Sequence, residues 1–467
     1  MRYLYIILVL AFCLSCKQSV KEPSVAGAFY PADRAELQST VKSFLDNATG
    51  KDVDGRLIAV ISPHAGYIYS GQVAAYSYKN LKDASTVILI GGAHKAAYKG
   101  ASVYARGSWR TPLGDVPIDE KLAGMLLSDQ DDVVFYPEAF EGEHSLEVQL
   151  PFLQSVLAKG FKIVPILISN PTKQMYDRLA GLLTEILAKD KRAVIVTSTD
   201  LSHYFDYESA KIKDAATIDA VETLSTRKLE DLLRSREGEM CGGFGVMLTL
   251  DVSRRLGANA GVLYKYANSG DVTGDKSSVV GYAALGLYKT SLTEAERKEL
   301  LSLAKMAISK RVREGKPLDY STHNPKFIAD GAAFVTINRM GKLRGCIGNV
   351  VPVMPLYQSV AMNAYYASSN DPRFVPMTPD ELDDMQIEVS ILSPLIPVTD
   401  ISEIQVGRDG LYIVKDGRTG ILLPQVAPEQ GWDRDTFLSM ICKKAGLPED
   451  AWKSGAELYR FEAEIIR

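Results

Sequence analysis

Residues 56–71 read RLIAVISPHAGYIYSG, an unbroken apolar run that ends in a proline, a histidine and two glycines. Continuous runs of Val, Ile and Leu are typical of strands that are buried on both faces, as in a parallel sheet. His64 lies just beyond this run, and a simple turn does not require an imidazole. The stretch therefore predicts a buried strand over residues 56–62 and makes His64 a candidate functional residue.

Three later segments have the same apolar character: STVILIGG, FKIVPILIS and RAVIVTSTD, at residues 85–92, 161–169 and 192–200. Residues 34–48 and 173–191 repeat leucine at intervals of three and four, as amphipathic helices do. Strands and helices in this order predict an α/β domain with helices on both faces of its sheet. We expect this domain over residues 22–288.

The remaining residues, 289–467, have a different pattern. Thr293 followed three residues later by Glu296 is a capping-box signature, which predicts that a new helix begins there. Beyond it, apolar segments with glycine at the turns are interrupted by two helical stretches, residues 352–368 and 433–446. This half is predicted to form a second domain, of the α+β class.

The first residues are similar to a secretory signal, because Arg2 precedes an apolar run, residues 3–12, that is too short to span a bilayer. The tripeptide LSC that ends at Cys16 is similar to a bacterial lipobox, although a cysteine stands where leucine is usual before it. We expect a signal peptide at residues 1–16 and a lipoprotein anchored to a membrane of the cell envelope through Cys16. The alternatives are a secreted or periplasmic protein with an ordinary signal peptide, or an uncleaved anchor.

The composition argues against a nucleic-acid-binding protein and against a fold held by disulfide bonds. The chain has 467 residues and a net charge of −4, and it lacks the basic blocks that are typical of nucleic-acid binding. Three cysteines follow residue 16, namely Cys241, Cys346 and Cys442, and no two of them form a C-x-x-C pair. An odd number of separated cysteines argues against a disulfide framework.

Polar side chains follow several of the predicted strands. His64 and His94 each come after one strand, and Asp200 and His203 come after another. Because the carboxyl ends of parallel strands meet at one edge of a sheet, we expect these four side chains to line a shared crevice.

A cysteine adds to this set. Cys241 lies in MCGGFG, a small-residue segment predicted to be a loop or a helix start. A thiolate beside imidazoles suits iron, copper or zinc. The alternative is a set of histidines that hydrogen-bond turns and a buried cysteine, since no H-x-x-x-H or C-x-x-C spacing occurs.

A second polar group lies in EGEHSLEVQLPFL, residues 141–153, which is predicted to start an amphipathic helix. Glu143 and Glu147 would suit the positive end of the helix dipole. His144 is a candidate supporting residue of the crevice, and a solvated position at the helix start is the alternative.

Over residues 22–288 the motifs GAFYPAD, PHAGYIYSG, GAHKAAYKG, TPLGDVPID, EHSLEVQLPFL, STDLSHY and CGGFG occur in the order seen in the Memo family, which the chain resembles. Memo proteins resemble class III extradiol dioxygenases, which are non-haem iron enzymes. The resemblance implies that His64, His94 and Cys241 are metal ligands and that Asp200 and His203 lie in the same pocket. The chain departs from the family at GGAHK, where a Gly-Pro pair is common.

Residues 295–467 resemble the AMMECR family through LRGCIG, DPRFVPMTPDEL, IEVSILSP, GILLPQVAPEQGW and FLSMICKKAGL. That family has no agreed activity. Arg344 and Cys346 of LRGCIG are candidates for a nucleophile or anion site, and a tight turn with a packed cysteine is the alternative.

Proteins of these two families occur together with a radical S-adenosylmethionine protein in the AmmeMemoRadiSam system, and the resemblance implies such a partner. The function expected first is an iron-dependent, dioxygenase-like redox enzyme, in which His203, Asp200 and His144 serve catalysis beside the metal, with copper or zinc as other candidate metals. The alternatives are a scaffold that binds a peptide or protein in an enzyme-like pocket, and a protein that stores or delivers iron or copper.

Overall fold

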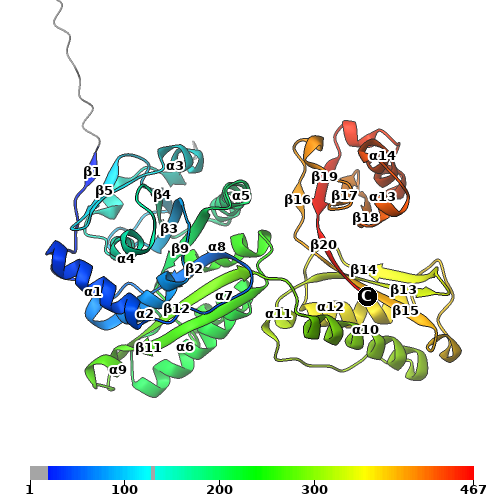
Figure 1. Cartoon of the computed structure of the whole chain (residues 1–467), viewed down its shortest axis with the longest axis horizontal. Helices are drawn as coiled ribbons and strands as arrows, with labels where there is room; N and C mark the ends of the chain where they lie inside the picture. Colours follow the sequence, from blue (N-terminus) through cyan, green and yellow to red (C-terminus); the bar gives the residue numbers. More distant parts are fainter. Residues whose placement is uncertain (1–18, 128–131) are drawn as a thin grey trace, which may run out of the picture.

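The computed structural model describes residues 19–127 and 132–467. Figure 1 shows an N-terminal α/β body in blue to green and two smaller lobes in yellow and red. The predicted signal peptide and Cys16 lie outside the described residues. Among the residues that are described, no helix is both long and apolar enough to cross a bilayer.

The N-terminal body is built on a nine-stranded sheet in the order β10-β12-β2-β9-β3-β8-β4-β7, with β11 paired to β12. Four neighbouring strands are parallel, and they are the four apolar runs of the sequence: β2 (Arg56–Ser62), β9 (Ala193–Ser198), β3 (Thr86–Gly92) and β8 (Lys162–Ser169). The flanking strands are β10 (His203–Phe205), β12 (Val279–Lys289), β11 (Ala260–Asn268), β4 (Gly100–Val103) and β7 (Val133–Val134). The prediction of buried parallel strands is confirmed.

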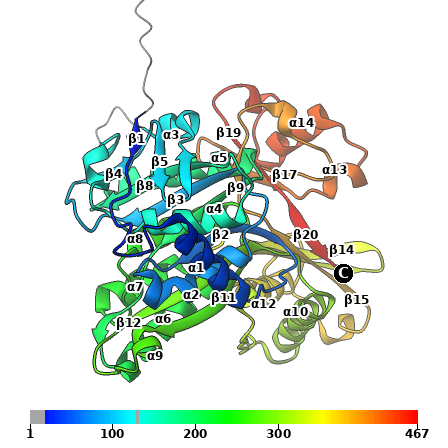
Figure 2. The same ribbon diagram turned by 60° about the vertical axis from the view of Figure 1, so that its left-hand side comes forward.

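Helices cover both faces of this sheet. On one face lie α1 (Arg34–Asn47), α2 (Tyr67–Lys79) and α4 (Leu150–Val156), and on the other lie α5 (Lys173–Lys189), α6 (Tyr207–Glu222), α7 (Thr226–Ser235) and α8 (Gly243–Arg255). Figure 2 brings α1 and α2 in front of the sheet. Neighbouring residues of β12 point to opposite faces, since Gly281 lies against Asp214 of α6 while Tyr282 shares an apolar cluster with Val73 of α2.

Smaller elements complete the body. A side sheet contains β1 (Val20–Lys21), β5 (Ser108–Thr111) and β6 (Gly114–Pro117), and the short helices are α3 (Glu120–Leu126), α9 (Ser269–Thr273), η1 (Pro137–Phe140) and η2 (Glu147–Gln149). Asp33 and Thr172 cap α1 and α5 by accepting hydrogen bonds from first-turn amides. Both helices therefore begin where the sequence predicts them.

The remainder of the chain forms two lobes. The first has the sheet β14-β13-β15-β20, covered on one face by α10 (Glu294–Glu314) and α12 (Leu356–Ala367). Its strands are β13 (Ala332–Arg339), β14 (Lys342–Gly348), β15 (Met385–Leu392) and β20 (Ala463–Ile466), with the short helices α11 (Pro325–Ile328) and η3 (Pro379–Glu381). The capping box is confirmed, because Thr293 and Glu296 exchange hydrogen bonds at the start of α10.

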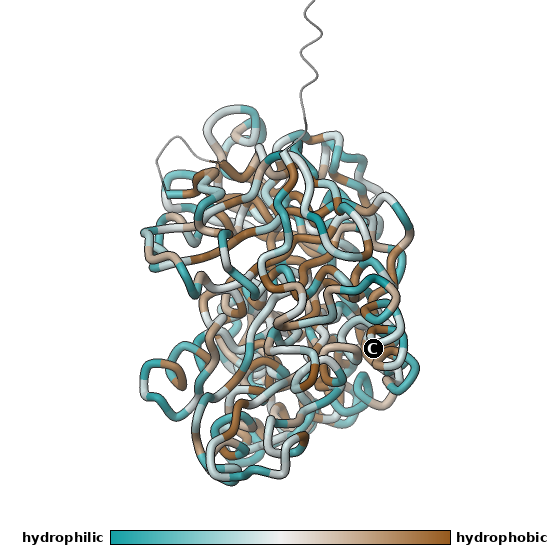
Figure 3. The backbone as a smooth tube through the Cα atoms, turned by 90° about the vertical axis from the view of Figure 1, so that its left-hand side faces the viewer, coloured by the Kyte–Doolittle hydropathy of each residue, from teal (hydrophilic) through white to brown (hydrophobic). Residues whose placement is uncertain are grey.

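The second lobe has the sheet β16-β19-β17-β18. Its elements are β16 (Ile396–Pro397), β17 (Gly410–Lys415), β18 (Arg418–Leu422), β19 (Glu457–Phe461), α13 (Val426–Glu429), α14 (Arg434–Lys444), η4 (Ile401–Glu403) and η5 (Ala451–Lys453). The main core of the N-terminal body ends at Leu287, whereas the core of the first lobe begins at Leu292. Figure 3 shows hydrophobic segments inside the fold and hydrophilic segments along its outline.

Candidate metal centre

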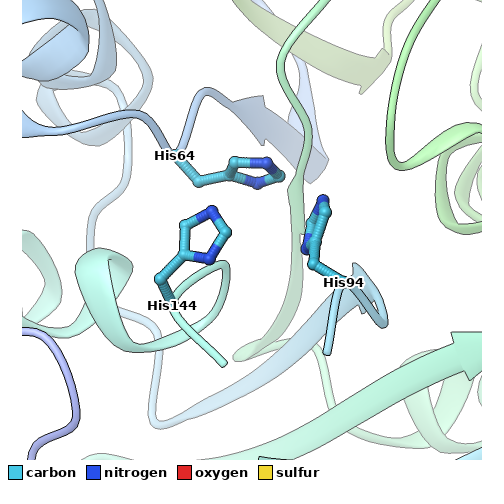
Figure 4. Close-up of side chains that lie close together, drawn as sticks. All are labelled: His64, His94 and His144. Atoms are coloured by element: carbon cyan, nitrogen blue, oxygen red, sulfur yellow. The ribbon is translucent and has the colours of Figure 1, made fainter. Parts of the chain in front are cut away.

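Three histidines converge at the carboxyl edge of the parallel strands. His64 follows β2, His94 follows β3, and His144 comes from the loop that precedes η2 and α4. One ring nitrogen of each lies within 4.8 Å of the other two, and the ring centroids are 5.0–5.2 Å apart. Figure 4 shows the three rings pointing toward a common centre.

The ring of His64 is fixed from the strand beside it. Its Nδ1 lies 2.8 Å from the Ser198 hydroxyl at the end of β9, and its backbone N–H donates to the Asp200 carboxylate at 2.7 Å. The other ring nitrogen, Nε2, lies 3.1 Å from Sγ of Cys241. The buried imidazole of His64 therefore presents Nε2 to the sulfur and to the other two histidines.

A buried carboxylate supports the other two rings. Glu143 accepts a hydrogen bond from the backbone N–H of His94 at 2.6 Å, and Oε1 lies 3.0 Å from Nδ1 of His94 and 3.5 Å from Nδ1 of His144. Burial alone would raise the pKa of Glu143, but the hydrogen bonds from His94 and the Ser145 N–H lower it to about 2. The carboxylate is thus ionised and orients both rings.

The two imidazoles beside Glu143 have opposite proton affinities. The contact with the Cys241 thiol, followed by the hydrogen bond to Glu143, raises the pKa of His94 to about 9. Burial and the neighbouring His64 lower the pKa of His144 to about 4. A metal ion at this point would displace a proton from His94 and meet a neutral His144.

The N-terminal segment closes one side of the group. Phe29 packs on His144 with ring centroids 4.7 Å apart. The buried Glu147 holds this segment by accepting hydrogen bonds from the backbone N–H groups of Ser24 and Val25 and from the Tyr30 hydroxyl. The GAFYPAD motif is therefore part of the wall of the site.

Cys241 reaches the histidines because glycines permit close approach. It lies at the amino end of α8, and its Sγ is 3.2 Å from the Asp200 backbone N–H. A Cβ on Gly92 would lie 3.0 Å from the Cys241 carbonyl oxygen, and one on Gly242 would lie 2.7 Å from the Ser198 carbonyl oxygen. Side chains at these positions would push the thiol away from the rings.

One sequence prediction needs correction here. The helix expected around Glu143 and His144 begins only at Leu150, after the short η2, so both residues lie in a loop. Glu143 and Glu147 are buried, at 2% and 1% exposure, and they accept hydrogen bonds from other segments. The local pattern could not reveal this, because the groups that satisfy both carboxylates come from distant segments.

The third histidine of the group is His144. His203 lies in β10, where it pairs with Val280 of β12, and its Nδ1 is 3.6 Å from Glu239. Asp200 lies at the site, where it fixes the backbone of His64. The expected crevice therefore contains Asp200, and another loop adds the imidazole of His144.

Arg344 and Cys346, the candidate residues of the second domain, have separate hydrogen-bond partners. The Arg344 guanidinium donates two hydrogen bonds to Glu381, whereas the Cys346 thiol accepts one from Thr336 at 3.2 Å and the Cys346 N–H donates to Asp371. Burial raises the pKa of Cys346. The motif lies within strand β14, not in the tight turn that was the alternative, and none of these contacts supplies the thiol with an activating base.

Comparison with known proteins identifies both halves. Residues 21–286 match the model of the Memo-like protein family and residues 301–466 match that of AMMECR1. The chain belongs to the Memo family, as a fusion of a Memo domain with an AMMECR1 domain, and the fold of its first domain is related to that of extradiol dioxygenases.

Individual relatives agree with this assignment. A MEMO1 family protein of Methanosarcina mazei is 37% identical over 270 residues, which are 57% of this chain and 98% of that protein. One of Aquifex aeolicus is 38% identical over 272 residues, again 57% of this chain and 98% of that protein. An uncharacterised protein of Pyrococcus horikoshii with a crystal structure is 37% identical, and the match covers 37% of this chain and 92% of that chain, with a TM-score of 0.36.

The donor set fits a transition metal. Imidazole nitrogens and thiolate sulfur are ligands for iron, copper and zinc. Metal-binding histidines usually engage their second ring nitrogen with a carboxylate or another polar group, as His94 does with Glu143 and His64 with Ser198. The site thus has both the inner ligands and the supporting contacts of a metal centre.

Proposed function

We propose that the Memo domain binds iron at His64, His94 and their neighbours and uses it in a dioxygenase-like redox reaction on a small molecule. The observation that carries the proposal is the convergence of three imidazole nitrogens within 4.8 Å, with the Cys241 thiol 3.1 Å from one of them. Iron bound there would supply one-electron chemistry and an open position for an oxygen ligand.

The protein's own residues would have distinct roles in this function. His64 and His94 would hold the metal, with Cys241 or His144 as the third ligand. Asp200 would keep the His64 backbone in place, as its hydrogen bond to that N–H indicates. His203, whose side chain is 27% exposed, is the candidate to exchange protons with solvent beside the site.

Elemental analysis of purified protein tests this proposal. Wild-type protein should contain stoichiometric iron, and His64→Ala and Cys241→Ala should each lose most of it while keeping the far-ultraviolet circular dichroism of the wild type. His323→Ala is the matched control, since this histidine lies in the second domain. Folded wild-type protein that takes up no metal after incubation with Fe(II) would refute the metal centre.

A second candidate function is recognition of a peptide or protein at the same site. Exposed apolar side chains lie on the segments that bear the site residues: Tyr69 is 39%, Tyr204 78% and Phe244 47% exposed. Tyr69 lies in the first turn of α2, which follows His64, and Tyr204 follows His203 in β10. A metal-dependent redox protein and a binding module differ in turnover, so consumption of dioxygen by the Fe(II)-loaded chain separates them.

Two further proposals rest on sequence alone. We propose lipid attachment at Cys16, which labelled palmitate tests: incorporation into wild type and not into Cys16→Ala is expected. We also propose a radical S-adenosylmethionine protein as partner, and co-purification of such an enzyme from the native cells should reveal it. A mature protein without lipid, or a complex without that enzyme, would contradict the respective proposal.

A further inference from the structure

Ser198, at the end of β9, belongs to a buried hydrogen-bond network beside His64. Its Oγ lies 2.8 Å from Nδ1 of His64, 2.6 Å from the backbone carbonyl oxygen of Ser145 and 2.9 Å from Nε2 of Gln149. The residues Ser198, Ser145 and Gln149 are fully buried, and His64 is 2% exposed. Because buried polar groups pair with one another, the proton on each of these hydrogen bonds can be assigned from the chemistry of its two partners.

The orientation of the Gln149 amide is fixed at both ends. Its Nε2 lies 3.0 Å from the Pro63 carbonyl oxygen, which can only accept, so this atom is the amide nitrogen and donates. At the other end, Oε1 accepts a hydrogen bond from the Tyr78 hydroxyl. Tyr78 is itself buried and stacks on Phe152, with ring centroids 5.0 Å apart. The amide nitrogen therefore donates to Ser198 as well.

The single proton of the Ser198 hydroxyl belongs to its hydrogen bond with the Ser145 carbonyl oxygen. That oxygen can only accept, and two oxygens 2.6 Å apart need a proton between them. One lone pair of the Ser198 oxygen accepts from Gln149, and the other is left for Nδ1 of His64. Since the hydroxyl has no second proton to donate, the proton of the 2.8 Å contact must be on Nδ1 of His64.

The backbone of Ser145 connects this network to the support of a second ring. Its carbonyl oxygen accepts the Ser198 proton, and its N–H donates to Oε1 of Glu143 at 3.0 Å. The same carboxylate oxygen lies 3.0 Å from Nδ1 of His94. One loop residue thus holds both the hydroxyl beside His64 and the carboxylate beside His94.

We infer that Ser198 is a positioning residue, which fixes the neutral His64 ring as the tautomer with its proton on Nδ1. Nε2 is then unprotonated, and this is the atom that lies 3.1 Å from the Cys241 thiol. An imidazole binds a metal through its unprotonated nitrogen, and the hydrogen bond at the other nitrogen decides which one that is. The role in metal binding rests on the proposed function, whereas the tautomer is a property of the metal-free chain.

NMR of the metal-free full chain with isotope-labelled histidine tests the tautomer, at a pH where the ring is neutral. Long-range proton–nitrogen spectra distinguish a protonated ring nitrogen from an unprotonated one, and the signals of His64 are those that disappear in His64→Ala. Wild type should show a protonated Nδ1 and an unprotonated Nε2. Ser198→Ala should lose this preference, because Nδ1 then has no hydroxyl to donate to.

The positioning role is tested by the affinity for Zn(II), measured by competition with a chromogenic chelator. Ser198→Ala should bind Zn(II) about 10–100-fold more weakly than wild type, the usual effect of removing a contact behind a metal ligand. Ser62→Ala is the matched control, because Ser62 is the equally buried cross-strand neighbour of Ser198 on β2 and takes no part in these hydrogen bonds. It should retain both the tautomer and the affinity.

Two results would overturn the inference. One is a wild-type His64 ring protonated on Nε2, and the other is a Ser198→Ala chain with the tautomer or the Zn(II) affinity of the wild type. The NMR spectrum needs no metal, so a wild-type chain that binds no metal would refute the proposed function, while its spectrum would still decide the tautomer.

Discussion

The two domains each place a cysteine in a short glycine-flanked motif, and the two thiols have opposite surroundings. Cys241 of MCGGFG meets His64 at 3.1 Å and contacts His94. Cys346 of LRGCIG accepts a hydrogen bond from Thr336 and has its backbone fixed by Asp371. The local sequences are alike, so the chemistry of each thiol is set by the neighbouring strands and loops that the fold brings to it.

Removal of an imidazole beside Cys241 should have the largest effect on metal affinity. His144→Ala should weaken metal affinity by more than about 100-fold if His144 is a ligand, since even outer contacts of metal sites contribute 10–100-fold. His203→Ala, the matched control, should retain the metal because its ring lies beside Glu239. Metal titrations of both variants measure this. A larger loss of affinity in His203→Ala than in His144→Ala would show that His144 is not a ligand.

Removing the carboxylate that supports the rings should have the next largest effect. Glu143→Gln keeps the shape of the side chain but loses the charge that orients His94 and His144, so metal affinity should fall by about 10–100-fold. Glu147→Gln is a neighbouring buried control that holds the N-terminal segment and not the rings. Competition with a chromogenic chelator measures both, and an unchanged affinity in Glu143→Gln contradicts the assigned role.

The thiols themselves can be compared by alkylation. In metal-free protein, Cys241 should react with iodoacetamide roughly tenfold faster than Cys346, since burial raises the pKa of Cys346 and reactivity follows the thiolate. The fully buried Cys442 is the internal control and should react last. Mass spectrometry of timed digests gives the three rates, and bound metal should protect Cys241 alone. Faster modification of Cys346 would reassign the reactive thiol to the second domain.

The smallest expected effect concerns the stability of the second domain. Asp371 accepts hydrogen bonds from Arg373 and from the Cys346 N–H, and the Arg373 contact is the main reason that its pKa is about 2. Asp371→Asn should cost about 1 kcal/mol in the free energy of unfolding at pH 7. Because the folded pKa is lowered, this stabilisation is present above pH 4 and is lost as the pH falls toward 2.

Urea denaturation at several pH values checks this last prediction. The difference between wild type and Asp371→Asn should shrink steadily from pH 4 to pH 2. A difference that stays constant over this range would mean that the Asp371 charge contributes nothing and that the variant acts through packing.

The sequence predicts those parts of the site that regular elements position. The apolar runs identify β2 and β3, so His64 and His94 can be placed at one edge of the sheet, and the glycines after Cys241 indicate a helix start. The sequence does not place His203 relative to the other rings, because the chain enters β10 after β9 and no periodicity predicts that strand. The sequence does not place His144 beside the other rings, because this residue lies in a loop. The ring that packs on it, Phe29, is more than a hundred residues earlier in the chain.

Anomalous diffraction from crystals of the iron-loaded chain tests the metal centre most directly. We predict a single peak in the first domain, bonded to ring nitrogens of both His64 and His94, with Cys241 or His144 completing the inner set. An ion bound elsewhere, or the three rings converged in iron-loaded crystals without any ion between them, would contradict the account.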